Sequence, residues 1–321
     1  MTATTLPFHL VNAFVVNSNP HSGNQAAVVI FPDASDARVK DDKWLTAVAR
    51  DFNFSETAYL VPISQLEDGE GEWGLRWFTP EVEVTLCGHA TLASAQVLFS
   101  LHPALQSIKF QTRFSGQLIA SRIEDKVEIT LPTLDTKTLS QESFGSINHD
   151  VEIEKLRKAF NMTDQDDGIL GIFEMDFGGN RCLIVQMNGN VDVAAIKVNT
   201  KALLEVTGCA VVTQVDQAQS LQTKQLHVNS RVFGPALGID EDPVTGSSHA
   251  HLTGYYFLSA ATKYIPEELL QSVKTPSEIT LVGHQRSSRG GELICRLDQN
   301  HHTYVKIVGK AHEFGKGSLH A

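Results

Sequence analysis

One sequence motif of this chain is repeated about half a chain length later, and this repeat limits the folds that the chain can adopt. Arg76-Trp-Phe-Thr-Pro80 matches Arg231-Val-Phe-Gly-Pro235. A glycine, Gly88 after the first copy and Gly246 after the second, then begins a run of small and apolar residues. Matches in the same order indicate two halves that arose from one duplicated unit, and two copies are too few for a solenoid.

A third match supports the duplication and sets the domain boundaries that we expect. Gln111-Thr-Arg-Phe-Ser-Gly116 resembles Gln285-Arg-Ser-Ser-Arg-Gly290, and a segment that alternates like a strand follows each copy. We therefore expect an N-terminal half over residues 1–133, joined by the C-terminal tail 308–321, and a C-terminal half over residues 134–307.

The local patterns predict an α+β fold with one buried helix in each half. Residues 90–98 are small or apolar nearly all round the helix, so this helix should be buried on every side, and Ser247 begins its partner. Short runs of β-branched and apolar residues predict strands, for example at 10–16, 26–31 and 57–61. Two pseudo-symmetric halves, each made of strands around a central helix, follow from these patterns.

Composition excludes several classes of partner. The net charge of −11 argues against binding to nucleic acid or to an anionic membrane, both of which require a basic surface. No segment has the ~20 apolar residues of a membrane-spanning helix, and Met1–Asn12 does not resemble a secretory signal. The four cysteines are scattered, which predicts free buried thiols in the reducing cytoplasm. We expect a cytoplasmic protein that acts on a small molecule.

The two glycine-led helix starts predict a site for an anion. The first N–H groups of a helix have no partners within it and carry partial positive charge, and glycine allows a ligand to approach the backbone. Gly88 and Gly246, in matching positions, predict a slot in a cleft between the halves that suits a carboxylate and enolate-like charge. Ser247 would add a hydroxyl, His89 a hydrogen bond or a proton, and Asp242 would orient His89 or relay a proton.

Glu56 is the candidate acid and base. Its sequence neighbours Phe54, Ala58 and Leu60 are apolar, and a carboxylate that faces an apolar cleft has a raised pKa, which suits proton transfer near neutral pH. We therefore expect a raised pKa for Glu56.

Plain structural interpretations remain open for the same residues. Glu56 could be a surface or capping carboxylate, His89 and Ser247 helix caps, and Asp242 a turn residue before proline. Cys87 could be a thiol base, but its counterpart is Thr245, so a racemase with two thiols would lack its second base. His249 and His251 would lie on different faces of a helix and make a poor metal pair, so we expect neither a metal nor an organic cofactor.

Several of these segments, in this order, resemble the phenazine biosynthesis-like (PhzF-type) proteins, which share the diaminopimelate epimerase fold. The similar segments are Asn12-Ala-Phe14, Gly23-Asn-Gln-Ala-Ala-Val-Val29, Ser55-Glu-Thr-Ala-Tyr59, Arg76-Trp-Phe-Thr-Pro80, Leu86-Cys-Gly-His-Ala-Thr91, Glu241-Asp-Pro-Val-Thr-Gly-Ser247 and Ser288-Arg-Gly-Gly291. The resemblance implies two β-barrel-like halves, each around a central helix, a site in the cleft between them, a homodimer and no cofactor. It also implies that Glu56 is the acid/base and that His89 holds or protonates the substrate, and it places the family's aspartate at Asp242 and its serine at Ser247.

The function that follows is a cofactor-independent isomerase that transfers a proton on a small carboxylated metabolite. The family's characterised reaction is the isomerisation of a dihydro-hydroxyanthranilate, but Ser248 here follows the Gly-Ser pair where many members have alanine, so the resemblance does not determine the substrate of this chain. Two alternatives stay open: a racemase or epimerase of an amino-acid-like substrate, and a non-catalytic metabolite-binding protein that keeps the fold.

Overall fold

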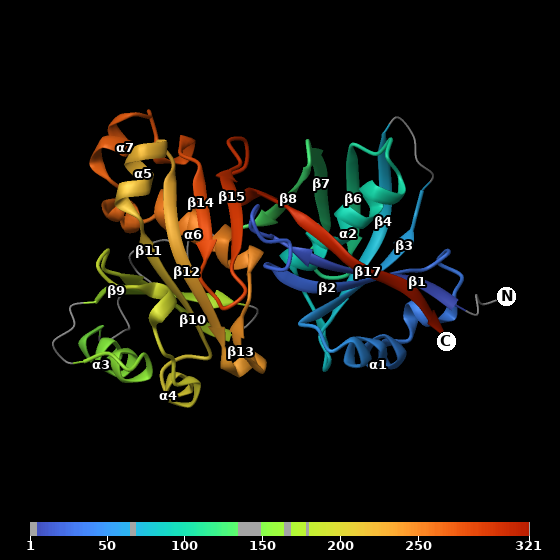
Figure 1. The fold of residues 1–321 in the computed structure, drawn as a ribbon, viewed down its shortest axis with the longest axis horizontal. Helices are drawn as coiled ribbons and strands as arrows, with labels where there is room; N and C mark the ends of the chain where they lie inside the picture. The colour runs from blue at the N-terminus through green and yellow to red at the C-terminus, as the bar shows by residue number, and fades with distance from the viewer. Residues whose placement is uncertain (1–4, 65–68, 134–148, 164–167, 178–179, 321) are drawn as a thin grey trace. The chain divides into compact units, whose positions relative to one another are not determined.

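A computed structural model describes residues 5–64, 69–133, 149–163, 168–177 and 180–320. It divides the chain into two units, which are described one at a time: unit 1 contains Met1–Leu131 and Lys306–Ala321, and unit 2 contains Pro132–Val305 (Figure 1). No helix in the described ranges is long and apolar enough to cross a membrane.

Unit 1 is a curved sheet in which the C-terminal strand lies along the first one. The pairs β17–β1 and β1–β2 are antiparallel, β2–β3 is parallel, β3–β4 is antiparallel, β4–β6 is parallel, and β6–β7 and β7–β8 are antiparallel. A short strand, β5, extends β4. The bounds are β1 Thr5–Ala13, β2 Asn24–Ile30, β3 Glu56–Pro62, β4 Glu70–Phe78, β5 Glu83–Val84, β6 Ser107–Thr112, β7 Gln117–Ile123, β8 Lys126–Pro132 and β17 Ala311–His320.

Unit 2 repeats the same alternation of strand directions. Here β9–β10 is antiparallel, β10–β11 parallel, β11–β12 antiparallel, β12–β14 parallel and β14–β15 antiparallel, while β13 extends β12. The duplication predicted from the repeated motifs is therefore present in the topology. The bounds are β9 Ile169–Phe177, β10 Asn180–Met187, β11 Cys209–Val215, β12 Leu226–Gly234, β13 Ile239–Asp242, β14 Leu281–Gln285, β15 Gly291–Leu297 and β16 Tyr304–Gly309, the last of which crosses the boundary between the units.

Each unit contains the buried helix that the sequence predicts. Helix α2, Gly88–Leu101, lies inside the curved sheet of unit 1 and contacts β1, β2, β3, β7 and β17 (Figure 1). Thr91 and Ser94 donate hydrogen bonds to carbonyls of the preceding turn, so these hydroxyls are satisfied without water. Helix α6, Gly246–Leu258, has the same place in the order of unit 2 and is also buried on most of its surface. Because neither helix contains an acidic or basic residue other than histidine, burying them leaves no lysine, arginine or carboxylate unpaired.

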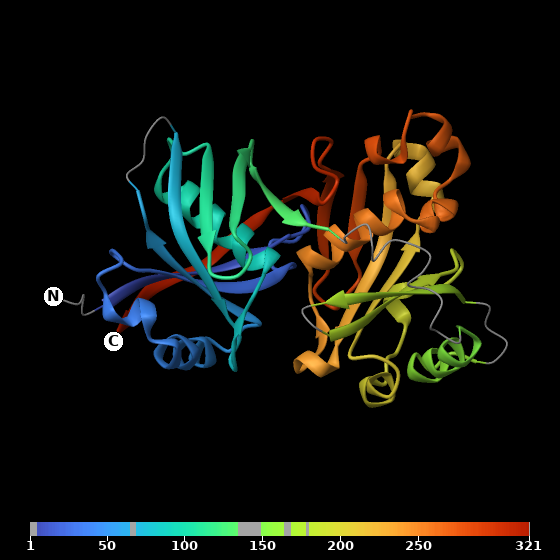
Figure 2. The same cartoon turned by 180° about the vertical axis from the view of Figure 1, so that it is seen from behind.

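Helix α1, Asp42–Phe52, packs outside the sheet of unit 1 (Figure 2). The Asp41 side chain accepts hydrogen bonds from the backbone of Lys43 and Trp44, which explains why the helix begins after Asp41. Its buried face joins Phe31 and Tyr59 in a core cluster. Within the described ranges, the other helices are α3 His149–Ala159, α4 Thr200–Leu204, α5 Gln217–Thr223 and α7 Glu267–Gln271, with short 3-10 turns at Ala37–Lys40, Val193–Ala195, Pro235–Leu237, Ala260–Tyr264 and Pro276–Glu278.

The repeated arginines make the same interaction in both units. Arg76 Nε and Nη2 lie 2.8 and 2.7 Å from the two carboxylate oxygens of Glu83, and Arg231 Nε and Nη2 lie 2.7 and 2.8 Å from those of Glu241. Each guanidinium also lies about 5 Å over the ring of the phenylalanine two residues later. These bidentate pairs tie β5 to β4 and β13 to β12, and thereby fix the segments that lead into α2 and α6.

The third sequence match is out of register by one residue. In unit 1, Gly74 pairs with Gln111, whereas in unit 2 the equivalent Asn229 pairs with His284 and not with Gln285. Because neighbouring residues of a strand point to opposite faces, this difference places the Gln285 side chain on the other face of the sheet from that of Gln111.

Candidate active site

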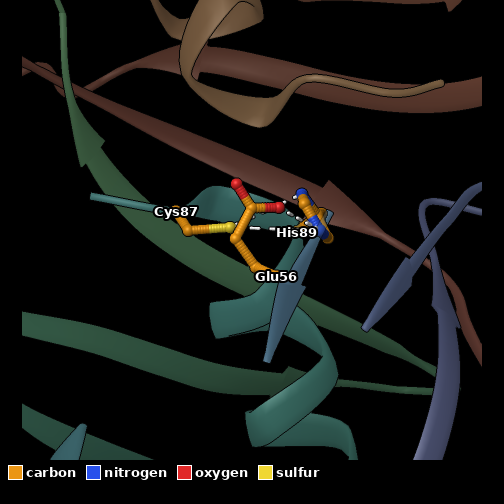
Figure 3. A group of neighbouring side chains, drawn as sticks. All are labelled: Glu56, Cys87 and His89. Carbon is orange, nitrogen blue, oxygen red and sulfur yellow. Dashed lines mark hydrogen bonds and ion pairs between the residues drawn. The ribbon is translucent and has the colours of Figure 1, made fainter. Parts of the chain in front are cut away.

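Glu56, Cys87 and His89 come together in unit 1 where β3 begins beside the start of α2. Glu56 is the first residue of β3, Cys87 is the N-cap of α2, and His89 is the second residue of that helix. Figure 3 shows the three side chains pointing toward one another. Their ligand atoms, a carboxylate oxygen, a sulfur and a ring nitrogen, all lie within 4.8 Å of one another.

Glu56 and His89 form a buried ion pair. Glu56 Oε2 lies 3.2 Å from His89 Nε2, and the two side chains are only 13% and 5% exposed. The plain interpretation of Glu56 as a surface carboxylate is therefore wrong. His89 is not the helix cap either, because the N-cap of α2 is Cys87. The side chain of Cys87 makes no capping hydrogen bond.

Two residues that the sequence analysis did not assign hold the histidine ring. Asn24 Nδ2 lies 3.2 Å from His89 Nδ1, and Ser55 Oγ lies 3.3 Å from Nε2 while it donates to Asn24 Oδ1 at 3.2 Å. Both residues lie in segments that carry the family resemblance, next to Gly23 and Glu56, and that adjacency is the signal that could have found them. Asn24 and Ser55 thus orient His89 within unit 1, and the expected orienting role of Asp242 stays a prediction.

Gly23 fixes where Asn24 enters the site. Its φ is +78°, in the left-handed region, and a Cβ atom there would lie 2.3 Å from the carbonyl oxygen of Ala13. Only glycine fits this turn without moving the backbone, so Gly23 sets the start of β2 and the direction of the Asn24 side chain.

The ion pair gives Glu56 a lowered pKa, and the expectation of a raised one is wrong. Burial alone would raise the pKa of Glu56, but the charge of His89 and hydrogen bonds from His89, Ser55 and Cys87 outweigh it. Its apolar sequence neighbours contribute only the burial, whereas the opposing charge comes from α2. The unliganded site therefore holds a carboxylate.

The pKa values of His89 and Cys87 are also shifted, and these shifts determine the other charges of the site. Burial alone would lower the pKa of His89, but negative charge at Cys87 and Glu56 and hydrogen bonds to both raise it well above its usual value. Burial raises the pKa of the Cys87 thiol, and the negative charge of Glu56 raises it further, while His89 opposes this less strongly. The raised pKa of Cys87 favours the thiol, and in that form only the carboxylate of Glu56 contributes the negative charge that raises the pKa of His89. All four cysteines are free and buried, as the sequence predicts.

In unit 2, the start of α6 is organised around Asp242. The hydroxyl of Thr245, the N-cap, donates a short hydrogen bond to Asp242 Oδ2. The amide of Gln285 accepts from Thr245 N at 2.8 Å and donates to the Asp242 carbonyl at 2.6 Å. Thr245 and Gln285 thus hold Asp242 in place, through contacts that the sequence analysis did not predict. Ser247 is the second residue of the helix and not its cap, and Gly246 is the first.

Comparison with known proteins shows the family of the chain. The family model described as phenazine biosynthesis-like protein matches residues 11–317. Uncharacterized isomerases of Pseudomonas aeruginosa and Halalkalibacterium halodurans are each 33% identical, over 95% and 96% of both chains, respectively. A solved PhzF-family protein of Enterococcus faecalis is 28% identical, with a TM-score of 0.69 and coverage of 99% of this chain and 100% of that one.

A more distant structural neighbour shares the fold. It is described as a probable proline racemase of Agrobacterium radiobacter, and it is 11% identical with a TM-score of 0.54 over 98% of this chain and 92% of that one. The fold and the relatives together define an isomerase of the epimerase-like α+β class. Within that class, the chain belongs to the phenazine biosynthesis-like (PhzF) family.

Proposed function

We propose that this isomerase transfers a proton between two carbon atoms of a small carboxylated metabolite without a cofactor, and that Glu56 carries the proton. The observation that supports this most directly is the buried carboxylate of Glu56 at 3.2 Å from the imidazole of His89, whose pKa is raised by the negative charge around it. A carboxylate poised in this way can act as a general base, and its protonated form can act as the acid in the second half of the reaction.

A carboxylate with a lowered pKa, such as that of Glu56, is a weaker base, and the positive charge of His89 compensates for this. When Glu56 takes a proton from carbon, the C–H bond breaks, an O–H bond forms, and the negative charge moves to the substrate as an enolate. Before the transfer, His89 stabilises the negative charge on Glu56, and after the transfer it stabilises the negative charge on the substrate. The favourable interaction between His89 and this charge therefore need not be lost in the transition state. Glu56 then returns the proton to a second carbon atom, and the charges of the unliganded site are restored.

We further propose that Gly88 contributes backbone N–H donors to the anion, and that Gly246, Ser247 and Asp242 bind the substrate carboxylate or relay the proton. Helix N-termini favour anions, and the N-cap residues of both helices, Cys87 and Thr245, give no side-chain cap to their own helices. That both helix starts act on one substrate stays a prediction.

A racemase with two thiols is the less favoured alternative. Thr245 occupies the N-cap in unit 2 that Cys87 occupies in unit 1, and its hydroxyl is engaged by Asp242. The raised pKa of Cys87 also leaves it protonated, so it is not itself a ready base.

The test is incubation with a panel of carboxylated cyclic and amino-acid-like metabolites in D2O, followed by mass spectrometry and NMR. Deuterium that appears at carbon, together with a shifted double bond, supports the proposal. Inversion at one carbon atom without a shifted bond would favour the racemase. Binding in a thermal-shift assay with no exchange across the panel would favour the non-catalytic alternative.

A further inference from the structure

We propose that Glu56, Cys87 and His89 also form an inhibitory site for a thiophilic divalent cation, with Zn²⁺ as the ion that suits it best. In the part of the chain that the structure describes, this is the group of three such side chains whose ligand atoms approach within 4.8 Å of one another. Metal binding follows from the geometry alone, whereas its effect on turnover rests on the proposed function.

The distances are close to those that a tetrahedral zinc ion requires. Zinc bonds to oxygen, nitrogen and sulfur measure about 2.0–2.3 Å, so tetrahedral ligand atoms lie roughly 3.3–3.6 Å apart. Glu56 Oε2 and His89 Nε2 are already 3.2 Å apart, and Cys87 Sγ lies 4.0 Å from the same nitrogen. All three ligand atoms lie within 4.8 Å of one another, so the side chains would have to draw together around an ion to occupy three positions of the tetrahedron.

The surroundings hold the ligands in place before a metal arrives. Cys87 and His89 belong to one helix start, so the backbone of α2 fixes their spacing. Glu56 Oε2 lies 3.2 Å from His89 Nε2, so Nε2 is the ring nitrogen that would bind an ion together with Glu56.

The chemistry of the ligands selects the ion. A thiolate and a neutral imidazole suit Zn²⁺ and disfavour Mg²⁺ and Ca²⁺, which prefer oxygen ligands. Binding would therefore break the S–H bond of Cys87 and an N–H bond of His89 and release both protons to solvent. Three protein ligands also leave a fourth position for water or a substrate carboxylate. A bound ion would occupy the oxygen that accepts the proton and the nitrogen that stabilises the enolate, so it would stop proton transfer.

Cobalt provides the direct test, because a Co²⁺–thiolate bond gives a near-ultraviolet charge-transfer band. We expect one equivalent of Co²⁺ to produce that band and the visible bands of four-coordinate cobalt in the wild-type protein, and Zn²⁺ to abolish them by displacement. Cys87→Ser should lose the charge-transfer band. Cys295→Ala, which removes a buried thiol in unit 2, is the matched control and should retain it. Far-ultraviolet circular dichroism confirms that each variant is folded.

Isothermal titration with Zn²⁺ measures the same site without a chromophore. Glu56→Gln and His89→Gln should each weaken binding at least about tenfold, as expected when one of three ligands is lost. No charge-transfer band in the wild type, or an undiminished band in Cys87→Ser, would overturn the metal site.

The effect on turnover is tested separately. Zn²⁺ at saturation should suppress deuterium exchange into the substrate, and a chelator should restore it. Undiminished exchange at saturation would overturn the inhibitory role. If no substrate exchanges at all, the proposed function fails, while the cobalt spectrum still decides whether the metal site exists.

Discussion

The carboxylate of Glu56 and the imidazole of His89 lie 3.2 Å apart and nearly out of contact with solvent, where the pKa of Glu56 is lowered and that of His89 is raised. The pair joins the first residue of a strand to the first turn of the central helix of unit 1. The position, charge and orientation of the candidate acid/base all depend on it, and so do the predictions below.

Replacing Glu56 with glutamine should remove catalysis and spare binding. Glutamine keeps the size and a hydrogen-bonding oxygen but cannot take a proton, so the rate of exchange should fall by about 10²–10⁴-fold. The dissociation constant of the substrate should change by only a few-fold. Glu70→Gln, an exposed carboxylate of unit 1 paired with Lys109, is the control and should exchange normally. Near-normal turnover in Glu56→Gln would remove Glu56 as the proton carrier.

The free energy of unfolding should depend on pH in the way that the Glu56–His89 ion pair predicts. The lowered pKa of Glu56 stabilises the fold above about pH 4.5, and this contribution is lost as pH falls through the pKa of the folded state. The raised pKa of His89 stabilises the fold fully below about pH 6.5, and this contribution is lost as pH rises through its folded value. The full effect therefore lies between about pH 4.5 and 6.5.

Urea unfolding of the wild type and Glu56→Gln across this range measures that effect as a difference in the free energy of unfolding. NMR titration should also show the His89 imidazolium persisting above its usual pKa in the wild type and titrating at lower pH in Glu56→Gln. Parallel stability curves, or a His89 pKa that the substitution does not change, would contradict the pairing.

Gly23→Ala should damage both stability and activity. A Cβ atom at Gly23 meets the Ala13 carbonyl at 2.3 Å and adds strain at a φ of +78°. Gly116 has a similar φ of +65° but nothing within 4 Å of the added atom, so Gly116→Ala isolates the strain, which we expect to lower the free energy of unfolding by about 1–2 kcal/mol. Gly23→Ala should be more destabilising than this and should slow turnover, because the start of β2 carries Asn24. Equal losses in the two variants would refute the steric argument.

The two arginine–glutamate pairs should stabilise their own units to similar extents. We expect Arg76→Gln and Arg231→Gln each to lower stability by about 1–3 kcal/mol, because each leaves a largely buried glutamate without its bidentate partner. Hydrogen exchange should increase near β5 in the first variant and near β13 in the second. Arg50→Gln, from an exposed pair with Glu81, should change stability by less than about 0.5 kcal/mol. Identical exchange patterns in the Arg76 and Arg231 variants would argue against local effects.

Ser247→Ala tests the role proposed for the start of α6. The loss of one hydroxyl that binds the substrate carboxylate should raise the dissociation constant about tenfold while the fold is preserved, because Ser247 is not the helix cap. Ser100→Ala, which removes an exposed hydroxyl near the end of α2, serves as the control. Unchanged affinity in Ser247→Ala would exclude that hydroxyl from the site.

The sequence by itself determined the duplication, the two buried helices and their glycine-led starts, and the burial of free cysteines. These features are local or repetitive: periodicity, glycine placement and the absence of charge along a helix can all be read without knowing the partners. The family motifs also identified Glu56 and His89, because the residues around them are characteristic even where their contacts are unknown.

Only the tertiary structure decided the electrostatics of the site. The apolar neighbours of Glu56 indicated a raised pKa, but α2 brings the positive charge of His89 to it, and an opposite charge at 3.2 Å outweighs burial. Asn24, Ser55 and Gln285 gained their roles in the same way, from contacts between separate elements, and the register of Gln285 differs by one residue from the sequence match. A pKa and a hydrogen bond depend on distances across space, which the order of residues along the chain does not contain.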